Sequence, residues 1–320
     1  MSAQGSHSIL PLVARAPAKE LQDWLEALNK VLASDTQVKL LGDLTPEERK
    51  AAEVAIVANP DPAELLNLPS LKWVHSLWAG VERLTSELPK DGPAIVRMVD
   101  PQMAETMSEA VLTWTLYLHR DMPRYARQQA GKVWQEHTLK LPSERTVTIL
   151  GLGKLGKTAA LRLKANGFNV CGWSRSPKQI DGIETHAGAE GFKTAFSKAD
   201  IAVLLMPLTP DTKGMMDAAA LASMPAGASL INFARGPIID DEALLAALDN
   251  GHIDHAVLDV FATEPLPKDH RYWDHPAVTV LPHISAPTIQ STASRIVAGN
   301  IAEYMKSGTI PESVDRSRGY

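Results

Sequence analysis

The feature that most constrains the fold is the stretch TVTILGLGKLGKTAALRL at residues 146–163. A short apolar run is followed at once by Gly151, Gly153 and Gly156 in the spacing G-x-G-x-x-G, and then by a helix-like pattern. This order lets the backbone approach a pyrophosphate that faces the free N–H groups of the helix N-terminus. The stretch therefore predicts a dinucleotide-binding unit, and the alternative is an ordinary strand-to-helix turn in which the glycines are incidental.

Apolar runs recur through the middle of the chain and lack polar alternation, which favours strands buried on both faces of a parallel sheet. They occupy residues 146–150, 169–173, 201–206, 228–234, 255–261 and 278–283. Helix-like stretches lie between several of them, such as residues 240–251, which begin with Asp240 and Asp241 and stop at Gly251, as helix caps predict. We expect a doubly wound α/β domain.

The first hundred residues repeat this pattern more faintly, which predicts a second, smaller α/β domain. Candidate strands lie at residues 8–14, 37–41, 54–59, 72–78 and 94–99, and an amphipathic helix is expected at 18–33. Residues 289–308 form another amphipathic pattern that could pack back on this first domain. Between the domains, residues 100–137 are helical in pattern and rich in apolar side chains, which suits either an interdomain helix or one that also buries a subunit interface.

Composition excludes several classes of protein. The chain has 320 residues, enough for two cores, and a net charge of -5 argues against general affinity for nucleic acid or anionic membranes. The single cysteine, Cys171, excludes an internal disulfide and suits a reducing compartment, so we expect a cytoplasmic protein. Its apolar surroundings favour a buried strand position over a reactive thiol. We expect no leader in the first twenty residues, no membrane-spanning segment and no metal site.

The second strand of the nucleotide domain lacks the acidic residue that usually binds the ribose of NAD. Residues 170–178 read VCGWSRSPK, and Ser174, Arg175 and Ser176 offer hydrogen-bond donors and positive charge instead. A guanidinium group matches a phosphate with its planar fork. This favours NADP(H) over NAD(H), and the alternative is an exposed arginine that contacts nothing.

Three chemically suitable side chains follow three successive strands of the predicted sheet. Arg235 comes after 228–234, Glu264 after 255–261, and His283 ends the run 278–283. Ligands collect at the carboxyl ends of such strands. Reduction of a carbonyl needs a cation that grips the substrate and a proton donor that titrates near neutrality, and a carboxylate beside a histidine favours the protonated form. Each residue alone could be a turn or cap residue, so the prediction depends on their joint placement.

The sequence resembles the D-isomer-specific 2-hydroxyacid dehydrogenase family, and in detail its glyoxylate/hydroxypyruvate reductase A branch, over nearly the whole chain. The motifs that carry the resemblance are ILGLGKLG, CGWSRSPK, LLMPLTPDT, LINFARGP, LLAALDNGHI, LDVFATEPLP, HPAVTVLPHISA and VDRSRGY. The resemblance implies a nucleotide-binding domain, 101–286, inserted into a discontinuous flavodoxin-like substrate domain, 1–100 and 287–320. The active site is expected in the cleft between them.

The resemblance also implies residue roles. Arg235 is expected to bind the substrate carboxylate and carbonyl, His283 to be the acid/base, and Glu264 to orient it. The backbone N–H groups of Ala79, Gly80 and Val81 are expected to receive the substrate carboxylate. The expected cofactor contacts are Gly151, Gly153, Lys154, Leu155, Gly156, Trp173, Ser174, Arg175, Ser176, Met206, Pro207, Thr212, Phe233, Ala234, Asp259 and Ser285, with Asp259 near the nicotinamide amide.

The family usually forms homodimers, which favours an interface at about residues 101–135, with Trp134 close to the partner's cleft. One departure from the family is Trp78, where a glycine is typical. Its ring either narrows the substrate pocket or stacks behind the loop, and we include it among the substrate-binding candidates.

The predicted function is NADPH-dependent reduction of short 2-oxo acids, such as glyoxylate and hydroxypyruvate, to 2-hydroxy acids. Two alternatives stay open. One is a nucleotide-sensing interaction protein on the same fold, although no interaction tails are apparent. The other is a dehydrogenase for a larger 2-hydroxy acid, although no basic cluster in the first domain clearly awaits a substrate phosphate.

Overall fold

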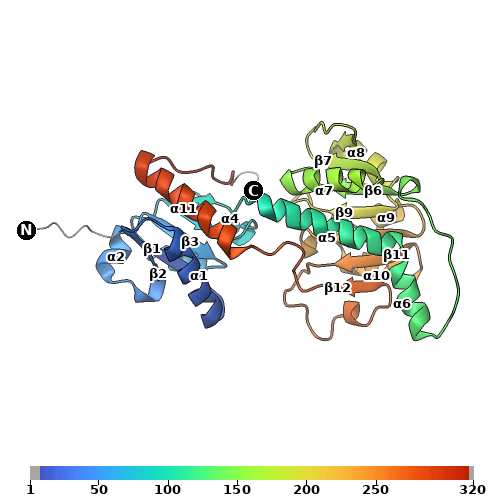
Figure 1. Ribbon diagram of the computed structural model, residues 1–320, viewed down its shortest axis with the longest axis horizontal. Coiled ribbons are helices and arrows are strands. Elements are labelled where there is room, and N and C mark those ends of the chain that lie inside the picture. Colours follow the sequence, from blue (N-terminus) through green and yellow to red (C-terminus); the bar gives the residue numbers. More distant parts are fainter. Residues whose placement is uncertain (1–7, 317–320) are drawn as a thin grey trace, which may run out of the picture. The chain divides into compact units, whose positions relative to one another are not determined.

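The computed structural model describes residues 8–316, which form two compact units (Figure 1). One unit comprises the described residues up to Gln102 and from Thr288 onward, and the other is Met103–Pro287. Residues 1–7 and 317–320 lie outside the described part. They include the start of the segment in which we expect no leader and the end of the VDRSRGY motif.

The unit Met103–Pro287 is built on a seven-stranded parallel sheet with the order β12-β11-β10-β9-β6-β7-β8. The strands are β6 (Thr146–Leu150), β7 (Asn169–Ser174), β8 (Glu184–Ala187), β9 (Ile201–Leu204), β10 (Ala228–Asn232), β11 (Ile253–Leu258) and β12 (Val278–Val280). The strand order turns back at β6, so the topological switch point lies between β6 and β9, where doubly wound sheets bind nucleotides. The predicted fold class is confirmed.

Helices cover both faces of this sheet. Helices α5 (Pro101–His119) and α7 (Lys154–Ala165) pack on one face, and α8 (Gly188–Phe196), α9 (Ala218–Ala222) and α10 (Asp241–Asp249) pack on the other (Figure 1). Alternate residues of one strand enter opposite cores: in β9, Ile201 and Val203 face α5 and α7, whereas Ala202 and Leu204 face the other layer. This explains why the strands read as continuous apolar runs.

Strand β8 was not predicted, because it carries no apolar run. It is an edge strand that pairs only with β7, and its sequence, ETHA, keeps its side chains half-buried or exposed. An edge strand with one open side needs few apolar residues, so the periodicity signal is absent.

The helical pattern at residues 100–137 is shorter and more broken than predicted. Helix α5 ends at His119, α6 (Met122–Ala130) follows after a short break, and residues 131–141 carry no helix or strand. At the break Asp121 is left-handed, with φ of 54°, and Pro123 lies in the first turn of α6. Proline cannot donate the backbone hydrogen bond that would continue α5, so the helix must restart.

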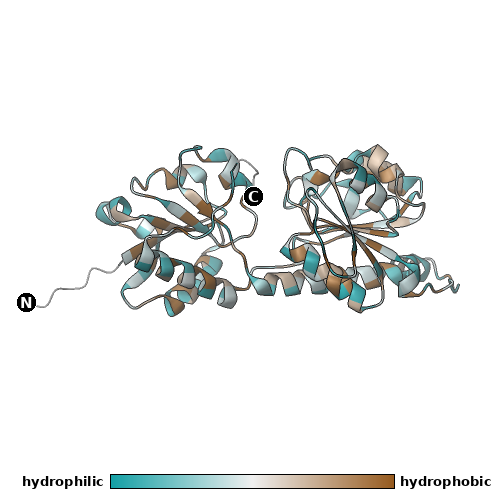
Figure 2. Ribbon diagram, turned by 90° about the horizontal axis from the view of Figure 1, so that it is seen from above, coloured by the Kyte–Doolittle hydropathy of each residue, from teal (hydrophilic) through white to brown (hydrophobic). Residues whose placement is uncertain are grey.

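The other unit has a five-stranded parallel sheet in the flavodoxin-like order β2-β1-β3-β4-β5. Its strands are β1 (Ser8–Ala14), β2 (Thr36–Leu40), β3 (Val54–Ala58), β4 (Trp73–Ser76) and β5 (Ala94–Val96), and its helices are α1 (Ala18–Val31), α2 (Pro46–Ala51), α3 (Pro62–Leu65), α4 (Glu82–Glu87) and α11 (Gln290–Ser307). Helices α1 and α11 share one face of the sheet, and α3 and α4 contribute to the opposite core. Figure 2 shows hydrophobic residues concentrated in the strands of both sheets.

Short 3-10 turns complete the structure at η1 (Leu41–Asp43), η2 (Pro142–Glu144), η3 (Gly236–Ile238) and η4 (Arg271–Trp273). Helix α10 has the predicted caps: the Asp240 carboxylate accepts a hydrogen bond from the Ala243 N–H at 3.0 Å, and Gly251 has φ of 75°. Cys171 is buried in β7, as expected. Across the described residues, none of the helices is both long and apolar enough to span a bilayer.

Candidate active site

The strongest candidate site lies at the carboxyl ends of β10, β11 and β12. These strands are neighbours and parallel, and the loops after them carry Arg235, Glu264 and His283. The loops therefore leave the sheet on the same edge. This is the edge at which open α/β sheets bind ligands.

His283 and Glu264 form a direct pair, with 2.7 Å between His283 Nδ1 and Glu264 Oε2. The other carboxylate oxygen of Glu264 accepts the Phe261 N–H at 2.9 Å, which fixes its orientation. The hydrogen bond to Glu264 raises the pKa of His283 above its usual value, against the opposing effects of burial and of the Arg235 charge. Burial tends to raise the pKa of Glu264, but the hydrogen bonds from His283 and Phe261 outweigh it and the pKa is lowered. An imidazolium bound to a carboxylate is thus favoured.

The backbone of His283 is left-handed, with φ of 56°, which is uncommon outside glycine. The buried carboxylate of Asp259 holds this conformation, because its two oxygens accept the N–H groups of Ile284 at 2.7 Å and Ser285 at 2.9 Å. Uncommon backbone conformations of this kind persist only when their surroundings determine them, and they cluster at functional sites. Asp259, expected only as a cofactor contact, therefore also positions the histidine loop.

Arg235 is positioned by two neighbours that sequence reasoning missed. The buried Asn232 side chain accepts the Ala234 N–H at 3.0 Å and donates to the Arg235 carbonyl at 3.1 Å. A Cβ atom on Gly236 would lie 2.0 Å from the Phe261 carbonyl carbon, so only glycine lets this loop pack on the loop that carries Glu264. An amide at the end of the apolar strand 228–234 was the available signal, since buried polar side chains need a structural reason.

Glycine occupies each of the three positions in the turn after β6 for a different physical reason. Gly151 has φ of 110°, and a Cβ there would lie 2.6 Å from the Met206 nitrogen. A Cβ on Gly156 would lie 1.9 Å from the Gly151 carbonyl oxygen, so α7 could not pack this closely on β6. A Cβ on Gly153 would meet no atom within 4 Å. Gly153 is therefore not required by packing, which fits a ligand that needs close approach to the backbone.

The turn also presents unsatisfied donors. Gly153 is the N-cap of α7 and supplies no side chain to the helix, while Lys154 and Leu155 form its first turn. The free N–H groups and the positive end of the helix dipole suit a pyrophosphate. The Ser285 Oγ, on the loop after β12, is buried and has no hydrogen-bond partner among the described residues. These features fit a dinucleotide at this edge.

At the end of β7 the predicted residues divide into buried and exposed pairs. The Trp173 Nε1 donates to the Gly188 carbonyl at 2.8 Å, and the Ser174 Oγ donates to the Ser176 carbonyl at 2.8 Å. Both side chains stabilise the strand end, whereas Arg175 and Ser176 are exposed. Arg175 is thus the first charged residue after this strand.

The remaining predicted cofactor residues follow other strands of the same sheet. Met206 and Pro207 come after β9, and Thr212 donates its hydroxyl to the Pro207 carbonyl at 2.8 Å. Phe233 and Ala234 come after β10 and are buried. All of them lie on loops that leave the carboxyl edge.

The loop of residues 78–81 follows β4 in the five-stranded unit. The Trp78 ring packs edge-on against Trp24, with 5.9 Å between ring centroids, and joins the core under α1 and α11. This edge-on contact favours the alternative in which the ring packs behind the loop. Ala79 and Gly80 are half-buried, Val81 is buried, and α4 begins directly after them.

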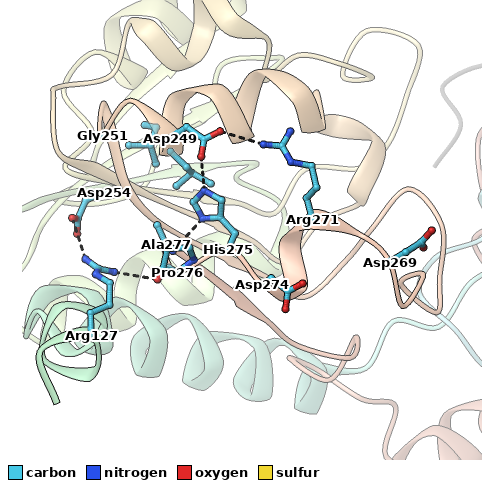
Figure 3. A pocket seen from close by; sticks show the side chains of 12 residues that line it. Arg127, Asp249, Gly251, Asp254, Asp269, Arg271, Asp274, His275, Pro276 and Ala277 are labelled. Carbon is cyan, nitrogen blue, oxygen red and sulfur yellow. Dashed lines mark hydrogen bonds and ion pairs between the residues drawn. The ribbon is translucent and has the colours of Figure 1, made fainter. Parts of the chain in front are cut away.

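A cavity of Met103–Pro287 lies away from the carboxyl edge. It measures about 610 Å³ and lies beside the amino ends of β11 and β12 (Figure 3). Its charged groups largely satisfy one another: Asp249 pairs with Arg271 and His275, both at 3.2 Å, and Arg127 donates to the Pro276 carbonyl. It contains none of the predicted site residues.

One group in the described part of the chain has the residue types of a metal site: Cys171, Glu184 and His186, on β7 and β8. The Glu184 Oε1 already binds His186 and Lys198, each at 2.8 Å. Burial raises the pKa of the Cys171 thiol to about 11, which disfavours the thiolate that a metal requires. The cluster is best described as an ion-pair network.

Comparison with known proteins identifies a nucleotide-binding domain in this part of the chain. The sequence matches the family described as D-isomer specific 2-hydroxyacid dehydrogenase, NAD binding domain, over residues 112–285. A glyoxylate/hydroxypyruvate reductase A from Serratia proteamaculans is 37% identical over 311 residues, which cover 95% of this chain and 98% of that protein.

Two solved structures are similar over almost their whole length. A D-isomer specific 2-hydroxyacid dehydrogenase from Xanthobacter autotrophicus Py2, in complex with NADPH and MES, has a TM-score of 0.88 at 38% identity and covers 97% of this chain and 99% of its own. An NADPH-dependent glyoxylate/hydroxypyruvate reductase from Sinorhizobium meliloti, in complex with NADP and sulfate, has a TM-score of 0.86 at 31% identity and covers 98% and 100%.

Proposed function

Because the chain belongs to the D-isomer-specific 2-hydroxyacid dehydrogenase family, and is thereby an NAD(P)-dependent oxidoreductase, we propose that it reduces short 2-oxo acids such as glyoxylate and hydroxypyruvate with NADPH. Relatives with these activities in their names support the substrate class. The observation that carries the proposal is the His283–Glu264 pair, which lies on the same sheet edge as Arg235 and the glycine turn.

His283 is the proton donor in this proposal. Its Nδ1–H is held by Glu264, so its Nε2–H can be given to the carbonyl oxygen of the substrate. The hydrogen bond to Glu264 raises the pKa of His283, which favours the protonated ring. When bound, NADPH supplies the hydride that adds to the carbonyl carbon, and the sum of hydride and proton turns a 2-oxo acid into a 2-hydroxy acid.

Arg235 binds the substrate carboxylate and the carbonyl oxygen in this proposal. A planar guanidinium donates two parallel hydrogen bonds to a carboxylate and stabilises negative charge that develops on the oxygen. The backbone N–H groups of Ala79, Gly80 and Val81 are proposed to receive the same carboxylate, with Trp78 as packing behind them.

The cofactor would be held by the glycine turn, with Arg175 and Ser176 toward a 2′-phosphate. Gly153 and the first turn of α7 suit the pyrophosphate, for the reasons of space and free donors given above. Asp259 and Ser285 are proposed to line the nicotinamide end. No acid stands among Ser174, Arg175 and Ser176 that would repel the phosphate.

A homodimer through about residues 101–135 is also part of the proposal. The side chain of Trp134 is 98% exposed and Val133 is 52% exposed, next to the exposed Leu139 and Leu141. Apolar side chains gathered on one extended segment usually mark a contact. Sedimentation should give a dimer mass for the wild-type chain and a larger monomer fraction for Trp134→Ser.

A cytoplasmic location stays a prediction from cysteine usage.

The function is tested by a steady-state assay that follows nicotinamide absorbance. Glyoxylate, hydroxypyruvate, a branched 2-oxo acid and 3-phosphohydroxypyruvate are each offered with NADPH and with NADH. We expect the highest kcat/KM for the two short acids with NADPH. Activity with none of the four would favour the nucleotide-sensing alternative, and preference for a larger acid would reassign the substrate.

A further inference from the structure

A second cavity of Met103–Pro287 lies at the amino edge of the sheet, the edge opposite to Arg235 and His283. It measures about 220 Å³. Its lining includes Arg145 just before β6, Ile201 at the start of β9 and Ser229 at the start of β10. Arg124 of α6 and Lys140 of the segment after α6 also line it. Nothing in the proposed reaction uses this cavity.

The charges around the cavity are unbalanced in favour of cations. Its acidic residues already have partners, since Asp121 lies 3.8 Å from Arg145 and Asp254 lies 3.8 Å from Arg127. Arg124 and Lys140 line the cavity but have no hydrogen bond or ion pair with any residue of the described chain. Two cationic groups are therefore available for a ligand.

A buried hydroxyl group points to the same ligand class. Ser229 is only 6% exposed and lines the cavity, and its Oγ makes no hydrogen bond within residues 8–316. The Nε of Arg145 is also buried and lacks a partner in the described structure. A buried donor without a partner costs free energy, and a serine hydroxyl open to a polar cavity can donate to a ligand, so both groups indicate a bound acceptor.

The nine-residue helix α6 adds to the positive potential. Its N-cap, Asp121, makes no side-chain bond to the helix, so the N–H groups of Met122 and Arg124 have no capping side chain, while Pro123 carries no N–H. The positive end of a helix dipole favours negative charge nearby. The larger cavity of Figure 3 differs in this respect, because its arginines are paired and four aspartates line it.

We propose that the cavity lined by Arg124, Lys140, Arg145 and Ser229 binds a small, doubly charged tetrahedral oxyanion, such as inorganic phosphate or sulfate. The Arg124 and Lys140 side chains neutralise the charge, while the Ser229 hydroxyl and the Arg145 guanidinium contact the oxygens. A water molecule takes about 30 Å³ of liquid volume, so 220 Å³ holds such an anion with part of its hydration shell.

The test is a calorimetric titration of inorganic phosphate into the full chain at constant ionic strength. Saturating NADP+ keeps phosphate out of the proposed cofactor site, and any phosphate that binds near Arg235 is common to all variants. The test variant is Arg124→Gln/Lys140→Gln. The matched control is Arg120→Gln/Lys132→Gln, which removes the same charge from the same exposed segment without touching the cavity.

We expect wild type and control to bind phosphate equally and the test variant to bind it roughly tenfold or more weakly, because hydrogen bonds to charged groups contribute about 1.5–3 kcal/mol each and 1.4 kcal/mol is tenfold. Ser229→Ala should weaken binding by about tenfold, because the hydroxyl donates to a charged oxygen. Sulfate should compete with phosphate, and acetate at equal ionic strength should not. Identical isotherms for test and control variants, or equal competition by acetate, would overturn the assignment.

Discussion

The two units of the chain share an architecture and differ in the turn after the first strand. Each unit has a parallel sheet with helices on both faces. In each, the strand order reverses direction at the first strand, which is β1 in one sheet and β6 in the other. After β6 the turn contains Gly151, Gly153 and Gly156, whereas after β1 it reads RAPAKE and the N-cap of α1 is Pro17. The sheet alone thus does not select a ligand, because the turn decides whether backbone N–H groups are open to a phosphate.

Buried and exposed histidines of the chain also differ. His75 in the five-stranded unit and His255 in the seven-stranded unit are buried, and burial lowers the pKa of each to about 4. His283 is 53% exposed at its side chain, and Glu264 raises its pKa. Burial without a carboxylate keeps an imidazole neutral, and a carboxylate keeps it charged. This difference separates a structural histidine from a candidate proton donor.

The largest effect should come from His283→Ala. Removal of the proton donor should lower kcat for glyoxylate or hydroxypyruvate by about 10²–10⁴, because general acid catalysis contributes that much. KM should change little, since Arg235 stays in place. The measurement is a steady-state assay with saturating NADPH.

A matched control is His186→Ala. His186 also pairs with a glutamate, Glu184, at 2.8 Å, but on the edge strand β8. This variant should keep wild-type kcat. A loss below tenfold for His283→Ala, or an equal loss for both variants, would remove His283 from the mechanism.

The sequence predicted the parts of the fold that depend on local pattern. Continuous apolar runs predicted six strands of the large sheet, and glycine spacing predicted the turn after β6. The edge strand β8 and the break at Asp121 escaped prediction, because an edge strand needs no apolar run and one left-handed residue leaves no periodic signal. Parallel strand order then brings Arg235, Glu264 and His283 to one edge.

The supporting contacts of the candidate site could not be read from the sequence. The hydrogen bonds from Ile284 and Ser285 to the Asp259 carboxylate join residues far apart in the chain. The close approach of Gly236 to Phe261 depends on how two loops pack. Both are tertiary effects without a spacing rule. The orphan Ser229 hydroxyl at the opposite edge likewise emerges only from packing.

The buried histidines predict a shared loss of stability in acid. With folded pKa values of about 4 and an ordinary value of 6.5, the unfolded chain binds more protons between these limits. The free energy of unfolding is therefore highest above pH 6.5 and falls toward pH 4. The loss is at most about 3 kcal/mol for each histidine.

Histidine NMR titrations and urea unfolding between pH 7 and pH 5 check this prediction. His75 has both nitrogens bonded, to the Ser76 carbonyl and the Asn300 amide, whereas His255 Nδ1 has no partner in the described structure. His75→Gln and His255→Gln should each reduce the pH dependence of unfolding. A measured pKa near 6.5 for either ring would contradict its assigned burial.

The glycine turn is tested by two alanine variants that should behave differently. Gly156→Ala places a Cβ 1.9 Å from the Gly151 carbonyl oxygen, so unfolding should become easier by about 1–3 kcal/mol. Gly153→Ala meets no atom within 4 Å, so Tm should hold. A methyl group there would still obstruct the proposed pyrophosphate, and KM for NADPH should rise by roughly tenfold, or about 1.4 kcal/mol. An unchanged KM for Gly153→Ala would show that the turn serves packing alone.

An effect no larger than that of Gly153→Ala should come from Arg175→Ala, which tests the end of the second strand. In the five-stranded unit β2 runs directly into η1 with Asp43, whereas β7 ends at Ser174 and exposes Arg175. Loss of one charge-assisted contact should raise KM for NADPH by about tenfold and leave KM for NADH unchanged. Lys178→Ala, in the same exposed loop, is the control and should preserve the preference. If Arg175→Ala keeps the ratio of kcat/KM for the two cofactors, the missing acid alone determines the choice of NADPH, and the cation after β7 has no part in it.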